Sequence, residues 1–286
     1  MRAASAVVDG PTLEALVHRA RSGDAVALEG VVVTIQHDIY RLALRMTACP
    51  EDAEDVTQEV LIKVITRLDA FRGDASVRTW AYRIAVRHVL DRRKSRVEAL
   101  GLQFDGFGAD LLDGLAASPE PDPVLVMEVK RGCTLAMLTC LDREHRLAFI
   151  LSDVFDLPHG EAADLCDVDE DVYRQRLSRG RRALEAFTRQ YCGLVNEAAP
   201  CHCSRRIARA EALGRVARDT PALAMHPAEV VDAAILDLEG LHDAATLMRQ
   251  HPPYITPPRV MEALRNVIVT SRRAPPSSAP VSPTTA

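Results

Sequence analysis

Aromatic and basic side chains alternate between residues 71 and 94, around the only tryptophan of the chain. Cations attract phosphates and aromatic faces stack on unpaired bases, so this mixture is typical of single-strand nucleic-acid binding. The residues alone leave an alternative open, in which the aromatic side chains are core residues and the arginines form a soluble helix surface. The candidate binding residues are Phe71, Arg72, Trp80, Arg83, Arg87, Arg92 and Arg93.

A second basic segment lies near residue 175 and has the pattern of a helix-turn-helix. Its first helix is expected at about 160–165, its turn at 166–168, and its second helix from Asp169, a good N-cap. Arginine, glutamine and aspartate can each read a base edge in the major groove. The alternative is a helical hairpin with a basic solvent face. The side chains expected to face outward are Asp171, Arg174, Gln175, Ser178, Arg179 and Arg182.

The segment 51–68 predicts a helix with two different faces. One face is an apolar stripe that includes Val56, Val60 and Val64. The other face is acidic and amide-bearing with one apolar residue, which is a plausible docking surface for a partner protein. An ordinary solvated face is the alternative. The docking residues are Asp55, Gln58, Glu59 and Ile62.

Three cysteines follow the basic helix with an unusual spacing, at Cys192, Cys201 and Cys203. Zinc requires four ligands, and Cys166 or His226 could supply a fourth. Two of the thiols could instead form a redox-active disulfide. Free thiols without a function are the third interpretation, and the spacing does not decide between them.

The elements that must position these residues are expected to be helices. Aromatic residues make up only 4% of the chain, while apolar residues make up 48% and recur at spacings of three and four. We therefore predict an all-α fold with two helical domains joined by a flexible linker, plus a helical C-terminal extension. The predicted units are 12–96, the acidic linker 97–123, the helix-turn-helix unit 124–190, the Cys-containing helical extension 191–271, and a disordered Pro/Ser/Thr tail at 272–286.

Charge and composition argue against a membrane-spanning protein, a secreted protein and an enzyme. The net charge is −5, but arginines and acids are segregated along the chain, as suits a protein that meets DNA on some surfaces and protein on others. We expect no membrane span and a cytoplasmic location, because no long apolar run and no signal peptide are present. No catalytic pattern stands out, so we expect no enzyme activity and no required cofactor.

Three segments resemble the extracytoplasmic-function (ECF) sigma factors. Residues 52–94 are similar to region 2 of that family, through the D-A-E-D-x-x-Q-E start, the F-R-G-x-x-x-x-R-T-W loop and the Tyr-Arg-Ile that follows. Residues 20–47 resemble its opening helices, and residues 141–189 resemble its region 4. The resemblance implies a promoter-recognition subunit that binds core RNA polymerase and catalyses nothing itself.

The resemblance also implies a role for each surface. Asp55, Gln58 and Glu59 would grip the coiled coil of the largest polymerase subunit. The loop 71–79 and the helix from Trp80 would capture the melted non-template strand of the minus-ten element. The recognition helix would bind the minus-thirty-five duplex, an anti-sigma factor is a further candidate partner, and the extension would control availability.

Two departures from the family pattern concern the helix-turn-helix. Asp167 stands in the turn where the family usually has glycine, and acids at 169–171 begin the recognition helix. These acids repel phosphate, so binding to the minus-thirty-five element is expected to be weak or unusual.

The main alternative function is a helix-turn-helix regulator that never joins polymerase. A metal-dependent enzyme in the C-terminal part is a third.

Overall fold

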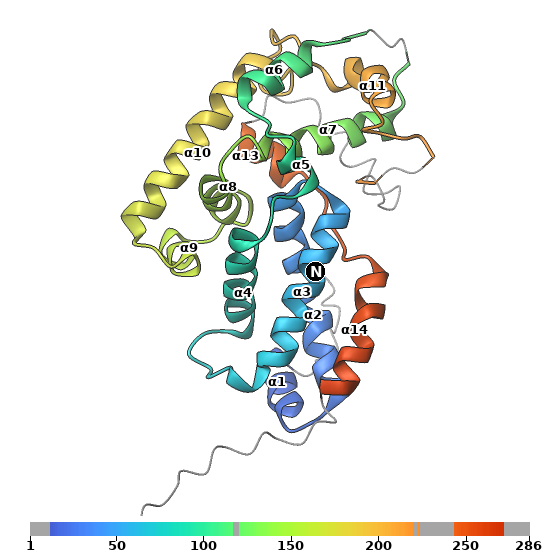
Figure 1. The fold of residues 1–286 in the computed structure, drawn as a ribbon. Coiled ribbons are helices and arrows are strands. Elements are labelled where there is room, and N and C mark those ends of the chain that lie inside the picture. The colour runs from blue at the N-terminus through green and yellow to red at the C-terminus, as the bar shows by residue number, and fades with distance from the viewer. Residues whose placement is uncertain (1–11, 117–119, 220–221, 224–242, 272–286) are drawn as a thin grey trace, which may run out of the picture.

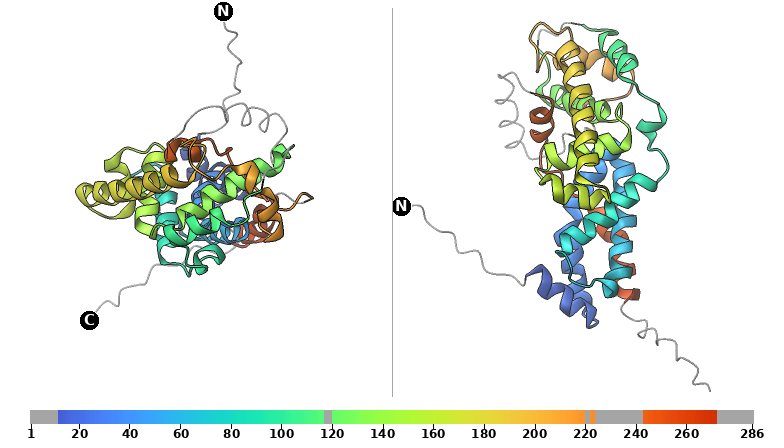
Figure 2. Two further views of the ribbon diagram at one scale, coloured as in Figure 1. Left: turned by 90° about the horizontal axis from the view of Figure 1, so that it is seen from above. Right: turned by 90° about the vertical axis from the view of Figure 1, so that its left-hand side faces the viewer.

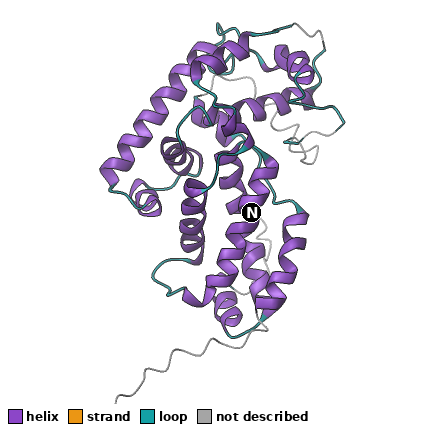
Figure 3. Ribbon diagram, viewed as in Figure 1, coloured by secondary structure: helices purple, strands orange, loops and turns teal. Residues whose placement is uncertain are grey.

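The computed structural model describes residues 12–116, 120–219, 222–223 and 243–271, and within these ranges every regular element is a helix (Figure 3). The α-helices are α1 Leu13–Arg21, α2 Ala25–Thr47, α3 Pro50–Arg67, α4 Val77–Asp91, α5 Arg96–Ala99, α6 Phe104–Leu112, α7 Pro123–Leu138, α8 Arg143–Phe149, α9 His159–Cys166, α10 Glu170–Tyr191, α11 Cys203–Ala212, α13 Ala244–Arg249 and α14 Pro258–Ser271. A 3₁₀ turn, η1 Leu68–Ala70, and a π-helical turn, η2 Ile150–Val154, complete the set. None of the described helices combines the length and the apolarity that crossing a membrane requires.

Helices α1 to α4 form the first helical group, and polar caps set where its helices begin. Thr12 accepts a hydrogen bond from the Ala15 amide, and Asp24 accepts one from Ala27, so α1 and α2 start at capping residues. Pro50 occupies the first turn of α3, where its missing N–H costs nothing. The core of the group is the apolar stripe of each helix, as the spacing predicts.

Helices α7 to α10 form the second group, which contains the helix-turn-helix. Asp167 in the turn adopts the left-handed conformation with φ 57°, which aspartate reaches more readily than most residues. Tyr173 is fully buried, and its hydroxyl donates a hydrogen bond to the Ala148 carbonyl oxygen at 2.9 Å. On α10 the side opposite the predicted outward face is buried, at Tyr173, Leu177, Gly180 and Leu184.

The segment 97–123 is more ordered than the sequence predicted. We expected little fixed structure there, but α5 and α6 lie within or at the edge of it. The reason is a tertiary contact: Phe107 stacks on Phe187 of α10, with ring centroids 5.5 Å apart. Leu111, one turn later on the same face, is also buried. Glycines at 106 and 108 therefore do not prevent a helix that an apolar partner holds in place.

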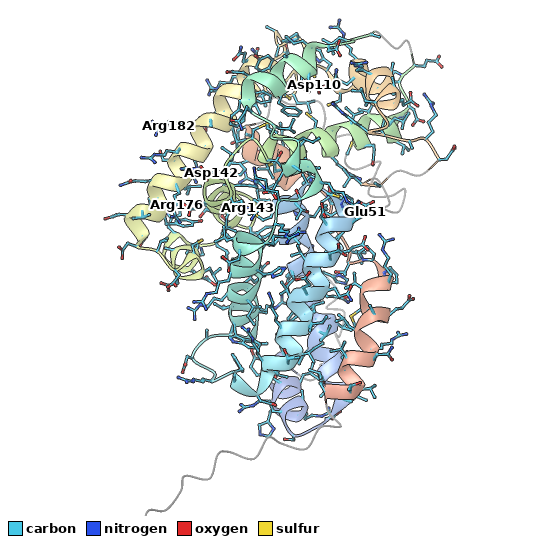
Figure 4. All side chains as sticks on the ribbon, viewed as in Figure 1. Glu51, Asp110, Asp142, Arg143, Arg176 and Arg182 are labelled. Atoms are coloured by element: carbon cyan, nitrogen blue, oxygen red, sulfur yellow. The ribbon has the colours of Figure 1, made fainter. Side chains whose placement is uncertain are left out.

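The two helical groups meet at Glu98. Arg143 donates hydrogen bonds to both carboxylate oxygens of Glu98 at 2.9 Å, and Arg146 donates a third at 2.9 Å. Arg143, labelled in Figure 4, also donates to the carbonyl oxygens of Leu90 at 3.0 Å and of Arg92 at 2.6 Å, at the end of α4. The start of the second group is therefore fixed to the end of the first.

The C-terminal strap, residues 243–271, runs from the second helical group back to the first. Its helix α13 lies near α10 and η2, and its helix α14 lies beside α3 and α2 (Figure 1). The two further views keep α14 on the first helical group, on the side away from α10 (Figure 2). The part of the extension between 224 and 242, which was predicted to be helical, lies outside the described residues.

Candidate nucleic-acid and polymerase interfaces

The loop 71–76 and helix α4 bring the predicted single-strand residues to one surface. Ser76 caps α4 by accepting a hydrogen bond from the Thr79 amide at 3.1 Å. Gly73 has φ 85°, a conformation that L side chains rarely adopt, which explains a glycine in this turn. Trp80 is half-buried and packs on Phe71, with ring centroids 5.4 Å apart. The Trp80 ring therefore contributes to packing and also remains accessible, and its binding to a single strand stays a prediction.

The arginines of this surface fall into two classes. Arg72, Arg83, Arg87 and Arg93 are exposed. Arg92 is different, because it is half-buried and its guanidinium lies 3.8 Å from the carboxylate of Asp52. Its position at the C-cap of α4 makes it part of the junction with α3, so the structure separates it from the other four.

An acidic turn faces the exposed arginines of α4. Arg83 and Arg87 line one side of a polar cleft, and the other side is the helix-turn-helix turn. The Arg87 guanidinium lies 3.7 Å from the Asp167 carboxylate. Sequence reasoning missed this juxtaposition, although the run of acids at 161–171 was its visible signal. The remaining lining residues of the cleft are Asp164, Leu165, Val168 and Asp169.

Helix α10 presents its predicted recognition face to solvent. All six side chains expected to face outward are exposed, and Arg182 lies on the outer side of the helix in Figure 4. Arg174 forms ion pairs within its own helix, with Glu170 at 2.5 Å and Asp171 at 3.7 Å. Arg176 instead pairs with Glu144 of α8 at 2.7 Å, which holds α10 against α8.

The predicted docking face of α3 is accessible along most of its length. Asp55 and Glu59 are exposed, while Gln58 and Ile62 are half-buried. The Glu59 carboxylate lies 3.3 Å from Nε2 of His88 on α4, and Nδ1 of His88 lies 2.6 Å from the Lys63 ammonium. Burial and the Lys63 charge lower the pKa of His88, so a neutral ring accepts the hydrogen bond from Lys63.

The three cysteines lie where α10 ends and α11 begins. Cys192 and Cys201 pair through their backbones, since the Gly193 amide donates to the Cys201 carbonyl at 2.8 Å and the Cys201 amide donates to Tyr191 at 3.1 Å. Burial raises the pKa of the Cys201 thiol to about 11 and of the Cys203 thiol to about 12. Within the described part of the chain, His, Cys, Asp and Glu side chains do not gather in any group of three or more that could hold a metal ion.

Asp38 is a further residue of the interface that the sequence did not single out. It lies on α2, and its carboxylate accepts a hydrogen bond from Arg78 at the start of α4. Arg41 lies 3.4 Å from the same carboxylate. These contacts orient the first turn of α4, which carries Trp80, but a single acid in a largely apolar helix gives no signal in the sequence.

Two family models match the chain in the segments that carry these surfaces. Sigma-70 region 2 matches residues 31–98, and Sigma-70, region 4 matches residues 131–184. These are the parts of a sigma factor that bind core RNA polymerase and promoter DNA. The first match covers the α3 and α4 surfaces, and the second covers the helix-turn-helix.

Similarity to characterised proteins extends over both segments. The chain is 32% identical over 183 residues to the ECF RNA polymerase sigma-E factor of Escherichia coli K12, covering 61% of this chain and 93% of that protein. It is 29% identical to the RNA polymerase sigma-H factor of Pseudomonas aeruginosa, covering 59% and 90%. A solved structure of CnrH in complex with the cytosolic domain of CnrY has 21% identity and a TM-score of 0.43, covering 60% of this chain and 93% of that one. The chain belongs to the family of ECF RNA polymerase sigma factors, which act on RNA polymerase in transcription initiation.

Proposed function

We propose that this sigma factor uses α4 for the melted minus-ten strand and α10 for the minus-thirty-five duplex. The observation that carries the assignment is the exposure of basic and polar side chains along one face of each helix, where the two family matches lie. The binding residues are Phe71 and Arg72 in the loop before α4, Trp80, Arg83 and Arg87 on α4, and Arg92 and Arg93 just after it.

The duplex is read by the outer face of α10. A recognition helix enters the major groove with its N-terminal part leading, so Arg174, Gln175 and Arg179 reach base edges and Arg182 reaches a phosphate. Asp171 either accepts a hydrogen bond from cytosine or weakens binding to DNA through its negative charge. The sites are supported by the exposed positions of Asp171, Arg174, Gln175, Ser178, Arg179 and Arg182.

Core polymerase docks on α3 in this proposal. The supporting observation is an accessible acidic and amide surface, with Asp55 and Glu59 exposed and Gln58 and Ile62 at its edges. The chain supplies specificity and catalyses no reaction. It works in the cytoplasm, where the polymerase is, and the C-terminal extension regulates it; an anti-sigma factor is a further proposed partner.

It stays a prediction that Cys192, Cys201 and Cys203 bind zinc or form a redox disulfide. Both reactions require the thiolate, and burial holds Cys201 and Cys203 in the protonated form at neutral pH. The backbone pairing of Cys192 with Cys201 supports a structural role better, because it fixes the turn between α10 and α11.

The deciding experiment is run-off transcription by core RNA polymerase with and without the full chain, on a library of genomic fragments. New discrete start sites in the presence of the chain support the proposal and yield the promoter sequence. A double Asp55→Ala/Gln58→Ala variant should lose start sites and core binding together. Duplex binding without core binding would instead identify a regulator that never joins polymerase.

A further inference from the structure

Helix α3 has a second stripe of buried side chains beside the inner stripe of Val56, Val60 and Val64. Glu54, Thr57, Leu61 and Ile65 follow one another at spacings of three and four, so they share one face of the helix. Each of these side chains is at most 8% exposed. Figure 1 shows what covers this face: α14 lies beside α3 and runs in the same direction.

Helix α14 of the C-terminal strap packs an apolar face onto that face of α3. Val260, Leu264 and Ile268 recur every fourth residue of α14 and are 2%, 0% and 3% exposed. Between them, Ala263 and Asn266 are exposed, so α14 has one apolar face and one solvated face. At its N-terminal end, the Arg259 guanidinium donates hydrogen bonds to both carboxylate oxygens of Glu54.

The covered stripe is next to the proposed polymerase face. Gln58 follows Glu54 by four residues and precedes Leu61 by three, and Ile62 precedes Ile65 by three, so the two stripes are neighbours around the helix. A stable protein interface buries about 800 Å² on each partner, which is more than one stripe of a single helix offers. A polymerase subunit centred on Asp55 and Gln58 therefore extends over the neighbouring α3 surface, which α14 covers.

The strap is held in place by short contacts on both helical groups. The Thr134 hydroxyl of α7 lies 2.6 Å from Nε2 of His251, and Arg249 donates to the Asp153 carbonyl oxygen at 2.8 Å. Farther along, the Thr256 amide donates to Nδ1 of His37 at 3.0 Å. These anchors lie before α14 in the chain, so α14 can leave α3 while residues 249–256 stay attached.

We propose that α14 and core RNA polymerase compete for the Glu54, Leu61 and Ile65 stripe of α3, so that α14 must leave before the polymerase docks. The inference rests on the proposed function of the α3 face. The free chain is then mostly closed, and its apparent affinity for polymerase is the intrinsic affinity multiplied by the small open fraction. The apolar side chains that α14 releases are covered again by the polymerase.

A pair of neighbouring substitutions tests the competition with the full chain. Leu264→Asp places a charge on the buried face of α14, whereas Ala263→Asp places the same charge on its exposed face. We expect Leu264→Asp to bind core RNA polymerase with a Kd lower by about tenfold or more, since the open fraction rises. Ala263→Asp should match the parent chain, and circular dichroism checks that both variants are folded.

A second pair of substitutions tests the same competition with smaller changes, which are less prone to disturb folding. Arg259→Gln removes the hydrogen bonds to Glu54, whereas Arg265→Gln removes a guanidinium that lies 3.8 Å from Glu29 of α2. Arg259→Gln should tighten binding by about two- to fivefold, as expected for one partly exposed ion pair, and Arg265→Gln should change it less. In the parent chain, hydrogen exchange of residues 258–271 should speed up when polymerase is added.

The outcomes separate two failures. Equal or weaker polymerase binding by Leu264→Asp and Arg259→Gln, with α14 still protected from exchange in the complex, overturns the competition and leaves the polymerase face intact. Absence of core binding by the parent chain and by every variant overturns the proposed function, and the competition with it. Tighter polymerase binding by both variants, together with faster hydrogen exchange of α14 in the complex, establishes the competition.

Discussion

Arg87 of α4 and Asp167 of the helix-turn-helix turn lie 3.7 Å apart, although eighty positions separate them in the sequence. One belongs to the proposed minus-ten surface and the other to the minus-thirty-five unit. If α4 binds the melted strand as proposed, the Asp167 carboxylate would repel a phosphate that approaches Arg87. The two proposed DNA-binding surfaces are therefore coupled while the helical groups are packed together.

Replacing Asp167 with asparagine should strengthen binding to a single-stranded minus-ten oligonucleotide by about two- to fivefold at low salt, the effect of one exposed charge. Asparagine tolerates the left-handed conformation at φ 57°, so the turn is preserved. Fluorescence anisotropy across a salt series measures the effect. Glu262→Gln removes one exposed acid from α14 and is the control; equal gains in both variants would mean that net charge alone is responsible.

Replacing Arg179 with alanine should weaken binding to promoter duplex by about 1–3 kcal/mol, the value of a good base contact. Arg189 lies on the same helix and is also exposed, but near its C-terminal end, so Arg189→Ala should have a much smaller effect. The measurement is a gel-shift titration of holoenzyme on duplex that contains the minus-thirty-five element. Equal losses in the two variants would count against α10 as the recognition helix.

Stability should depend on pH through Glu98. Burial alone would raise the pKa of this carboxyl, but hydrogen bonds from Arg143 and the Ser95 amide, with the charge of Arg146, lower it to about 2. Because the folded pKa lies below the usual value near 4.5, the stabilisation is present above pH 4.5 and is lost as pH falls toward 2. The loss should be on the order of 3 kcal/mol over that range.

Urea unfolding between pH 2.5 and pH 7 checks this dependence in the parent chain and in Glu98→Gln. The variant should be less stable at neutral pH, and its free energy of unfolding should fall less steeply on acidification. Glu14→Gln is a suitable control because Glu14 is exposed in the first turn of α1, away from the Glu98 contacts. Parallel pH profiles for the parent chain and Glu98→Gln would exclude Glu98 as the source.

Chain purified at neutral pH under reducing conditions should contain much less than one zinc per molecule. The physical reason is that the described His, Cys, Asp and Glu side chains form no group of three or more that could hold a metal ion, and burial raises the pKa of the Cys201 and Cys203 thiols, whose protons a metal must displace. Elemental analysis measures the zinc, and a chelator should leave the melting temperature unchanged. Stoichiometric zinc that is lost in Cys203→Ser would contradict the structural role and restore the metal interpretation.

The sequence by itself determined the helices and their exposed faces. Apolar residues at spacings of three and four placed the inner stripes of α3 and α10, and those stripes are buried as predicted. The same spacing put Asp55 and Arg179 on exposed faces. A helix of known period has no freedom to turn one residue inward without turning its neighbours, so local pattern was sufficient.

Only the tertiary structure decided what covers each face. Glu54 looked like one acid in an acidic helix, and its contact with Arg259 joins residues 205 positions apart. Likewise, α6 is a helix because Phe107 meets Phe187, which no local rule in a glycine-containing segment predicts. Contacts between distant segments depend on how whole helices pack, and their free energy is absent from any short window of the chain.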